Sequence, residues 1–116
     1  MTCFDRILLN LQQKLVEKQK QQLKHEWIKR NIKSQKVFIC FITKRFVRQA
    51  KRREECDLAE SLNRLMYAAV KRGTWWRKFK KYPWRKVYYF DCKEDLEHIM
   101  RDIYADMNFY LKAGGI

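Results

Sequence analysis

Apolar residues recur at helical spacing through the first third of the chain. The apolar stripe consists of Phe4, Leu8, Leu11, Leu15, Leu23 and Trp27. It is interrupted by EKQKQQ at 17–22, which is polar on every side. This pattern predicts a long helix over 4–31 that is solvated in its middle, because a helix segment without an apolar side buries little. Residues 1–31 are therefore expected to form an arm, or an element that pairs with a second copy of the chain.

The segment 36–53 is compatible with two structures. Its apolar run at 37–43, VFICFIT, is rich in the β-branched and aromatic residues that are typical of strands. In a helix, Phe38, Ile42 and Phe46 would share one side and the basic residues would lie on the other. Because a helix accounts for both sets of residues, we predict a helix and keep a strand at 37–43 as the alternative.

Residues 57–72 carry the clearest helical pattern inside the chain. Its apolar stripe comprises Leu58, Leu62, Leu65, Met66 and Ala69. Asp57 and Glu60 form a capping pattern at the start, and Gly73 suits the left-handed position after a helix end. A helix is therefore predicted over these residues.

Residues 91–113 are predicted to form the last helix. Its stripe comprises Leu96, Ile99, Met100, Ile103, Met107, Tyr110 and Leu111. Asp91 and Glu94 supply a second capping pattern, and Gly114 and Gly115 end the helix. A homodimer is expected to form, if at all, through this helix or through the N-terminal one.

The segment 74–90 between these helices is rich in aromatic residues and contains Pro83, which excludes a helix through its middle. We predict a two-stranded antiparallel hairpin that pairs roughly 74–80 with 85–91. The expected fold class is therefore mainly α, with about four helices and one small antiparallel β-hairpin near 74–91.

Composition limits the number of domains and the compartment. The 116 residues, of which 47% are hydrophobic, suit a single small domain over 1–116. The longest apolar run, Val37 to Ile42, is six residues, too short for a secretory signal or a membrane span. The cysteines, which lack the spacing of a zinc site, are Cys3, Cys40, Cys56 and Cys92. We expect reduced thiols in an intracellular protein of the cytoplasm or nucleoid of a host cell, neither secreted nor membrane-bound.

The charge is strongly positive and unevenly distributed. Lys and Arg number 27 against 13 Asp and Glu, which gives a formal net charge of +14. Residues 1–90 carry +17 of this charge and residues 91–116 carry −3. The segments 36–53 and 71–86 contain seven and eight basic residues and no acidic residue. Such an excess favours an anionic partner.

Residues 71–86 carry the most specific functional signal, because their eight basic residues are interleaved with five aromatic ones. Bases neutralise phosphates, and aromatic faces stack on unpaired nucleobases. Tryptophan is buried on average, so at least two of the tryptophans are expected in the core. The predicted nucleic-acid-binding residues are Lys44, Arg45, Arg48, Lys51, Arg52, Lys71, Arg72, Trp75, Trp76, Arg77, Lys78, Lys80, Lys81, Trp84, Arg85 and Lys86.

The predicted order of helix 57–72, basic hairpin 74–90 and helix 91–113 resembles the second half of a winged-helix DNA-binding domain. In that family a recognition helix precedes a β-hairpin wing, and a following helix often serves dimerisation. The resemblance implies that Gly73 starts the wing and that KKYPW forms its tip. Because helix 57–72 begins with acidic residues, the wing and the basic side of 44–53 would make most of the DNA contacts.

Catalytic patterns are weak in this sequence. His98 and Asp102 are four residues apart on a predicted helix, which is typical of an ordinary surface pair. An acidic cluster comprises Glu54, Glu55, Asp57 and Glu60. Metal-dependent nucleases use such carboxylates, but acids near a helix start also favour the helix dipole. Three glycines cannot supply a phosphate-binding loop, so we expect no enzymatic activity, no catalytic residue, no metal and no cofactor.

Two classes of function are compatible with these features. The first is a non-enzymatic protein that binds DNA or RNA through its basic, Trp-rich segment. The second is a small inhibitor or adaptor, of phage or plasmid type, that docks its basic aromatic face on an acidic or nucleic-acid-binding surface of another protein. Trp, Tyr and Arg are enriched at interface hot spots, so the segment 74–86 supports both equally.

Overall fold

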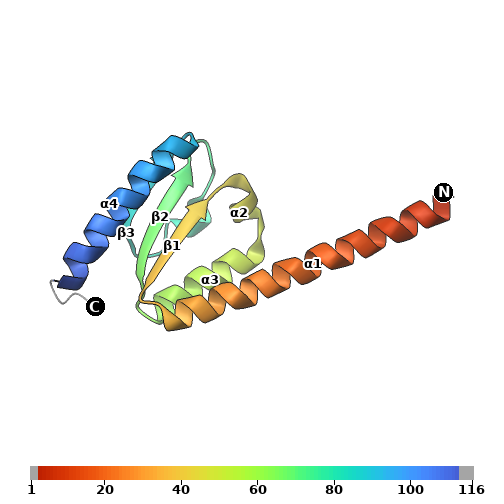
Figure 1. Cartoon of the computed structure of the whole chain (residues 1–116), viewed down its shortest axis with the longest axis horizontal. Helices are drawn as coiled ribbons and strands as arrows, with labels where there is room; N and C mark the ends of the chain where they lie inside the picture. Colours follow the sequence, from red (N-terminus) through yellow and green to blue (C-terminus); the bar gives the residue numbers. More distant parts are fainter. Residues whose placement is uncertain (1–2, 113–116) are drawn as a thin grey trace.

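A three-stranded, all-parallel sheet forms the centre of the protein, in the order β1-β2-β3. The computed structural model describes residues 3–112. Its elements are α1 (Cys3–Ser34), β1 (Val37–Ile42), α2 (Lys44–Arg48), α3 (Ala50–Ser61), β2 (Leu65–Lys71), the 3₁₀ helix η1 (Arg77–Phe79), β3 (Trp84–Phe90) and α4 (Lys93–Lys112). Helices α1 and α3 lie on one side of the sheet and α4 on the other (Figure 1).

The predicted antiparallel hairpin is wrong. Residues 74–80 form no strand, and β3 pairs in parallel with β2, with Ala68 opposite Val87. Pro83 does lie outside any helix, as predicted, but it ends a crossing connection and not a hairpin turn. The wing on which the winged-helix resemblance depends is therefore not formed.

The predicted helix over 36–53 is also wrong in its first half, where the alternative of a strand at 37–43 is the better description. VFICFI forms β1, and the helical part is split into α2 and α3 by Gln49, whose backbone is extended. The side chain of Thr43 accepts a hydrogen bond from the backbone N–H of Phe46 and so caps α2. A parallel strand that is covered on both faces usually has a continuous apolar sequence, and VFICFI is such a sequence.

The predicted helix over 57–72 is replaced by the end of α3 and the whole of β2. Strand β2 is central, and its residues 65–70 are all buried. Asn63, with a φ of 54°, makes the turn between helix and strand. Gly73 is left-handed, with a φ of 82°, but it follows a strand and not a helix. The small side chains of Ala68 and Ala69 leave room for the helices that pack above and below the middle of the sheet.

One face of the sheet packs against α1, α2, α3 and the connection between β2 and β3. The buried residues on this first face are Ile32, Cys40, Ile42, Cys56, Ala59, Met66, Ala68, Val70, Trp76, Phe79 and Tyr82. Both crossings between parallel strands therefore run over the same face. Two crossover connections of the same handedness pass over the same face of a sheet when each new strand is added on the same side of the previous one.

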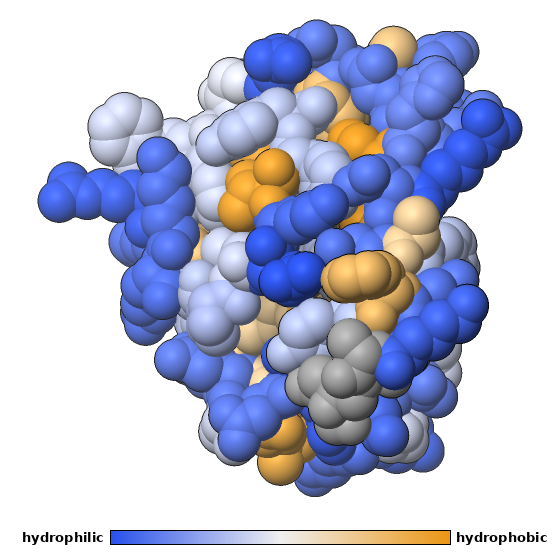
Figure 2. All heavy atoms as spheres, turned by 90° about the vertical axis from the view of Figure 1, so that its left-hand side faces the viewer, coloured by the Kyte–Doolittle hydropathy of each residue, from blue (hydrophilic) through white to orange (hydrophobic). Residues whose placement is uncertain are grey.

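The second face of the sheet is covered by α4, whose predicted apolar stripe packs against it. Ile99 and Ile103 are buried there together with Tyr67, Ala69 and Phe90. The stripe that we considered for a homodimer is thus occupied within the chain, apart from Leu111, whose side chain lies outside the described residues. Figure 2 views the molecule from the side of α4 and shows a largely hydrophilic surface with separate hydrophobic patches.

A polar cluster joins α4 to the start of β3. The hydroxyl of Tyr67 donates to Asp106, and Arg85 Nε lies 3.1 Å from Asp106 Oδ2. The Tyr67 hydroxyl and the Arg85 guanidinium hold the pKa of Asp106 below its usual value. A carboxyl with a lowered pKa in the folded state stabilises the fold above its unfolded pKa, and this contribution is lost as the pH falls through the folded value.

The cluster around Asp106 predicts a specific acid sensitivity. The free energy of unfolding should fall as the pH drops below about 4, the ordinary pKa of an aspartate. Asp106→Asn should lower stability at pH 7 and flatten that decline, and urea unfolding between pH 7 and pH 3 measures both. Glu97→Gln, on the exposed side of α4, is the control. A decline of the same steepness in Asp106→Asn and the parent chain would contradict this prediction.

The N-terminal helix α1 is longer than predicted and only its C-terminal part packs on the body, as Figure 1 shows. His25 and Ile32 are buried, whereas residues 12–24 are exposed. The polar stretch at 17–22 lies in this exposed part, as its lack of an apolar side predicts. The arm is consequently held by few residues, and those that hold it include charged ones.

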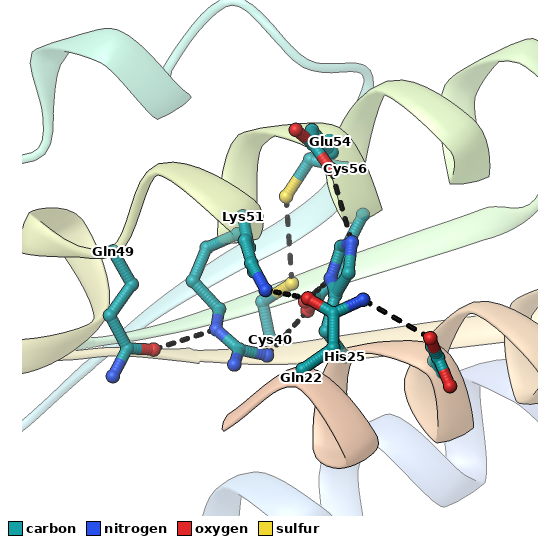
Figure 3. A network of polar contacts seen from close by, with 10 residues as sticks. Gln22, His25, Cys40, Gln49, Lys51, Glu54 and Cys56 are labelled. Carbon is teal, nitrogen blue, oxygen red and sulfur yellow. Dashed lines mark hydrogen bonds and ion pairs between the residues drawn. The ribbon is translucent and has the colours of Figure 1, made fainter. Parts of the chain in front are cut away.

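A buried polar network attaches α1 to α3 (Figure 3). His25 Nδ1 lies 2.7 Å from Glu55 Oε2, and its Nε2 lies 3.0 Å from Glu54 Oε2. Arg52 Nη1 lies 2.7 Å from Glu55 Oε1, while its Nε donates to Gln49 at 2.7 Å. Because Arg52 and Glu55 are both buried, their charges depend on each other for compensation, and the buried ring of His25 makes a further contact with the Glu55 carboxylate.

No disulfide joins the cysteines whose side chains the structure describes. Cys40 of β1 and Cys56 of α3 are buried thiols with their sulfur atoms 3.9 Å apart, and Cys92 is exposed. Burial raises the pKa of Cys40, which keeps it protonated and unreactive.

These environments predict unequal thiol reactivity. With iodoacetamide at pH 8, the peptide that contains Cys92 should be alkylated first, and those that contain Cys40 and Cys56 only after addition of denaturant. Peptide mass spectrometry gives the alkylation rates. We expect the rate at Cys92 to exceed those at Cys40 and Cys56 by at least about 100-fold, because a buried thiol reacts only when the structure around it opens. Equal rates in the native protein would contradict the described packing.

Candidate nucleic-acid interface

The carboxyl ends of all three strands lie at one end of the sheet, because the strands are parallel. Ile42 at the end of β1 is opposite Val70, and Lys71 at the end of β2 is opposite Phe90. The segments that follow β1 and β2 belong to the two acid-free, basic segments of the sequence. The fold thus brings their first residues to the same end of the molecule.

We call this surface the basic end. It comprises Lys44, Arg45, Arg48, Lys71, Arg72, Trp75, Arg77 and Lys78. Within the described residues the strand order advances without reversal, so the sheet lacks the switch point at which a ligand crevice forms in many α/β proteins. The basic end is a surface that suits an extended anion better than a small enclosed ligand.

Helix α2 contributes three bases because it is amphipathic. Phe46 and Val47 pack against the first face of the sheet, and this leaves Lys44, Arg45 and Arg48 exposed on the opposite side of the helix. The rings of Phe46 and Phe79 are 5.1 Å apart, so α2 and η1 are neighbours. The bases of α2 therefore lie beside those of the segment that contains η1.

The segment after β2 contributes the most unusual residue of this surface. Trp75 is 81% exposed, whereas the next residue, Trp76, is buried against Tyr89 with 6.3 Å between ring centroids. Arg77 and Lys78 are exposed at the start of η1, and Phe79 anchors that helix in the core. Burial of Trp76 and Phe79 thus fixes the backbone that presents Trp75 and the two bases to solvent.

Five of the bases carry uncompensated charge. In the described part of the chain, Lys44, Arg45, Arg48, Arg77 and Lys78 make no ion pair. The other two are engaged at Asp91. Arg72 Nε lies 3.0 Å from its carboxylate, and Lys71 donates to its backbone carbonyl. An exposed pair such as Arg72 with Asp91 is weak enough to exchange its partner for a phosphate.

Several predicted site residues serve the fold instead. Arg52 is buried in the network with Glu55, and Lys51 donates to Gln22 of α1. Trp76 lies in the core, and the indole N–H of Trp84 donates to the carbonyl of Phe79 at 2.8 Å. These residues stabilise the fold that supports the basic end and do not belong to the surface.

Arg85 and Lys86 lie at the opposite end of the sheet, where β3 begins. Arg85 pairs with Asp106, and Lys86 Nζ lies 3.5 Å from Asp102 and 3.6 Å from Asp106. The sequence placed them with Arg77 in one basic segment, but the connection crosses the whole first face between the two. Their charge is largely compensated by α4.

Lys80 and Lys81 occupy an intermediate position on this connection. Lys80 Nζ lies 5.6 Å from the ring centroid of Trp76, and Lys81 Nζ lies 5.2 Å from that of Tyr82. Both side chains are exposed and pack over aromatic rings of the core. They extend the positive surface away from the basic end along η1.

A further basic surface was missed in the sequence analysis. The exposed part of α1 carries Lys14, Lys18, Lys20 and Lys24, opposed only by Glu17. The apolar stripe of this helix does not indicate the basic surface. The signal was present in the excess of lysine over acid between residues 12 and 24, which a charge count along the helix reveals.

The acidic cluster considered for metal catalysis is used structurally. Glu54 and Glu55 contact His25, and Asp57 accepts a hydrogen bond from the hydroxyl of Tyr82 at 2.6 Å. Asp102, considered as a partner of His98, contacts Tyr88 and Lys86. Across the described residues no group of three or more His, Cys, Asp or Glu side chains is arranged to hold a metal ion.

Comparisons with known proteins add no family to this description. A scan against protein-family models, a search of curated proteins and a search of solved structures each found no match to the chain. None of the described helices is long and apolar enough to cross a membrane.

Proposed function

We propose that the protein binds nucleic acid without catalysing a reaction, and that the basic end is its binding surface. The observation that carries this proposal is the group of five uncompensated bases beside a tryptophan that is 81% exposed. Lysine and arginine gain affinity for phosphates by releasing counterions, and this gain does not require a pocket.

The exposed tryptophan favours a ligand with unpaired bases. A solvent-exposed indole next to several cations combines a stacking platform with phosphate contacts, as single-strand-binding surfaces do. Duplex DNA would use the cations but leave Trp75 without a stacking partner. We therefore place single-stranded DNA or RNA, including unpaired loops of structured RNA, ahead of duplex DNA. The free thiols of the described cysteines suit a reducing, intracellular setting for this function.

Titration of the full chain with labelled duplex DNA, single-stranded DNA and RNA at several salt concentrations tests the proposal. If five phosphates are contacted, log affinity should fall with log salt at a slope of about −4.5 for a duplex and about −3.5 for single strands. Absence of binding below about 10 μM at 100 mM salt, or a slope near zero, would refute the proposal, because phosphate contacts must release counterions.

A second candidate function is docking on an acidic surface of another protein. It is favoured by the same exposure of Trp75, because tryptophan and arginine at the centre of a surface are the residue types of protein–protein hot spots. Polyglutamate is a suitable probe. Binding to polyglutamate with no preference for any nucleic acid of equal charge would favour this second function over the first.

A further inference from the structure

The outer edge of β1 has no neighbouring strand in the described part of the chain. Among residues 3–112, which the structure describes, strand β1 pairs with β2 only, and it lies at the end of the strand order. The carbonyl of Lys36 accepts a hydrogen bond from the N–H of Leu65, so residue 36 faces β2. N–H and C=O groups alternate in direction along a strand, and those of Val37, Ile39 and Phe41 therefore face away from the sheet.

The sequence of β1 does nothing to protect this edge. VFICFI contains no proline, no charged residue and no glycine, and its backbone is a regular strand over all six residues. Natural edge strands usually carry charges, prolines or bulges that prevent another chain from pairing with them. An unprotected apolar edge is the feature that proteins use when they add a strand from a partner.

A groove of about 470 Å³ runs beside this edge. Its walls are the C-terminal part of α1, with Trp27 and Ile28, and helix α2, with Phe46. Trp27 is 61% exposed and Phe41 is 43% exposed, so large apolar side chains remain open to solvent on both sides of β1. A strand added at the edge would place alternate side chains in this groove.

The charges around the groove select the kind of strand that fits. Lys24 and Arg45 are among the residues that line it, and Lys36 and Lys44 lie just outside the two ends of β1. The carboxylate in the lining is Glu55, which is buried, paired with Arg52 and within hydrogen-bond distance of His25. The open edge is therefore apolar in its middle and positive at both ends.

We propose that β1 and this groove bind an extended segment of a partner protein, which adds as a fourth strand. The segment carries apolar side chains at alternate positions and acidic residues on both sides of them. Backbone hydrogen bonds to Val37, Ile39 and Phe41 supply affinity, the groove selects the apolar side chains, and the four flanking bases select the acidic ends. The site is separate from nucleic-acid binding except for Lys44 and Arg45, which belong to both surfaces.

A second copy of the chain fits this edge less well. If two β1 strands paired antiparallel around a two-fold axis, Lys36 of each copy would approach Thr43 and Lys44 of the other. Like charges that face each other across paired strands are destabilising. With a net charge of +14 on each chain, long-range repulsion acts in the same direction.

The test uses the full chain and a fluorescein-labelled peptide, EDVTVTIDE, which has alternating apolar residues and acidic ends. Anisotropy measures its affinity, and amide hydrogen exchange followed by NMR measures protection. We expect saturable binding, with slower exchange at Ile39 and Phe41. Two control peptides should bind at least tenfold more weakly: EDVTPTIDE, which lacks a central N–H, and KRVTVTIKR, which has basic ends.

Two exposed tryptophans provide matched variants of the protein. Trp27→Ala should weaken peptide binding at least tenfold, whereas Trp75→Ala should leave it unchanged, and both should unfold at the parent's temperature. Lys24→Glu should weaken binding of EDVTVTIDE and strengthen binding of KRVTVTIKR. Nucleic-acid affinity should follow the opposite pattern, with a loss in Trp75→Ala and none in Trp27→Ala.

Three results would overturn the proposal. The first is absence of peptide binding up to about 1 mM, a concentration that corresponds to only about 4 kcal/mol of affinity. The second is equal sensitivity to Trp27→Ala and Trp75→Ala. The third is a dimer in analytical ultracentrifugation that is disrupted by Ile39→Pro, because the occupant of the edge would then be a second copy. A negative result in the nucleic-acid titration would not change these three measurements, so the two proposals can fail independently.

Discussion

The variant Arg45→Ala/Arg48→Ala/Arg77→Ala/Lys78→Ala should bind nucleic acid at least about 100-fold more weakly than the parent chain at 100 mM salt, because it removes four of the five uncompensated cations of the basic end. The same loss should reduce the slope of log affinity against log salt by about 3 to 4, at nearly one unit per phosphate contact. These side chains are exposed and make no ion pair in the described structure, so the unfolding temperature should not change.

The matched comparison uses two double variants from the same basic segment. Arg77→Ala/Lys78→Ala and Arg85→Ala/Lys86→Ala each remove two positive charges within residues 71–86. The first should weaken binding and retain stability. The second should retain most of the binding and lower stability, because it leaves Asp106 without its guanidinium partner. Equal losses of binding in the two would show that net charge matters and that the basic end is not the site.

The ends of the chain were predictable because their patterns are local. The stripe of α4 is unbroken, and its helix begins and ends within two residues of the prediction. Even there the cap differs, since Asp95 rather than Glu94 accepts hydrogen bonds from the backbone N–H groups of Asp91 and Cys92. Helical periodicity is sufficient evidence where a helix covers one face of a sheet.

The strands were not predictable in the same way. A parallel strand with both faces buried lacks the alternation that marks a half-exposed strand, and its apolar run then matches a helical stripe as well. Leu65, Met66 and Ala69 continued the spacing of Leu58 and Leu62, so a turn and a strand were interpreted as one helix. The left-handed backbone of Asn63 breaks this continuity, and asparagine alone is weak evidence for such a break.

The candidate site was predicted in composition but not in position. The sequence identified the two acid-free basic segments, and the parallel sheet brings their first parts together. It could not separate Arg77 from Arg85, because that separation depends on a connection that crosses the sheet between them. The sequence also could not show that Arg52 is buried. Its burial depends on Glu55, which in turn contacts His25 of α1, a helix that is distant in the sequence.

That buried network leads to the largest expected change in stability. Glu55→Gln should lower the free energy of unfolding by about 3–5 kcal/mol, because it leaves the buried charge of Arg52 without its counter-ion. The loss should be accompanied by release of α1 from α3, since the amide also weakens the contact with His25. Urea unfolding measures the first effect, and limited proteolysis within residues 12–34 measures the second.

Two further variants separate the effect of the charge from that of packing. Glu54→Gln removes a neighbouring carboxylate of the same helix that is 64% exposed, and it should cost about 0–1 kcal/mol. His25→Leu/Arg52→Met/Glu55→Met replaces the whole network with apolar side chains and should recover most of the loss, because desolvation of the charges is then avoided. If this triple variant were as unstable as Glu55→Gln, the network would hold α1 by its specific hydrogen bonds, and an apolar interface could not substitute for it.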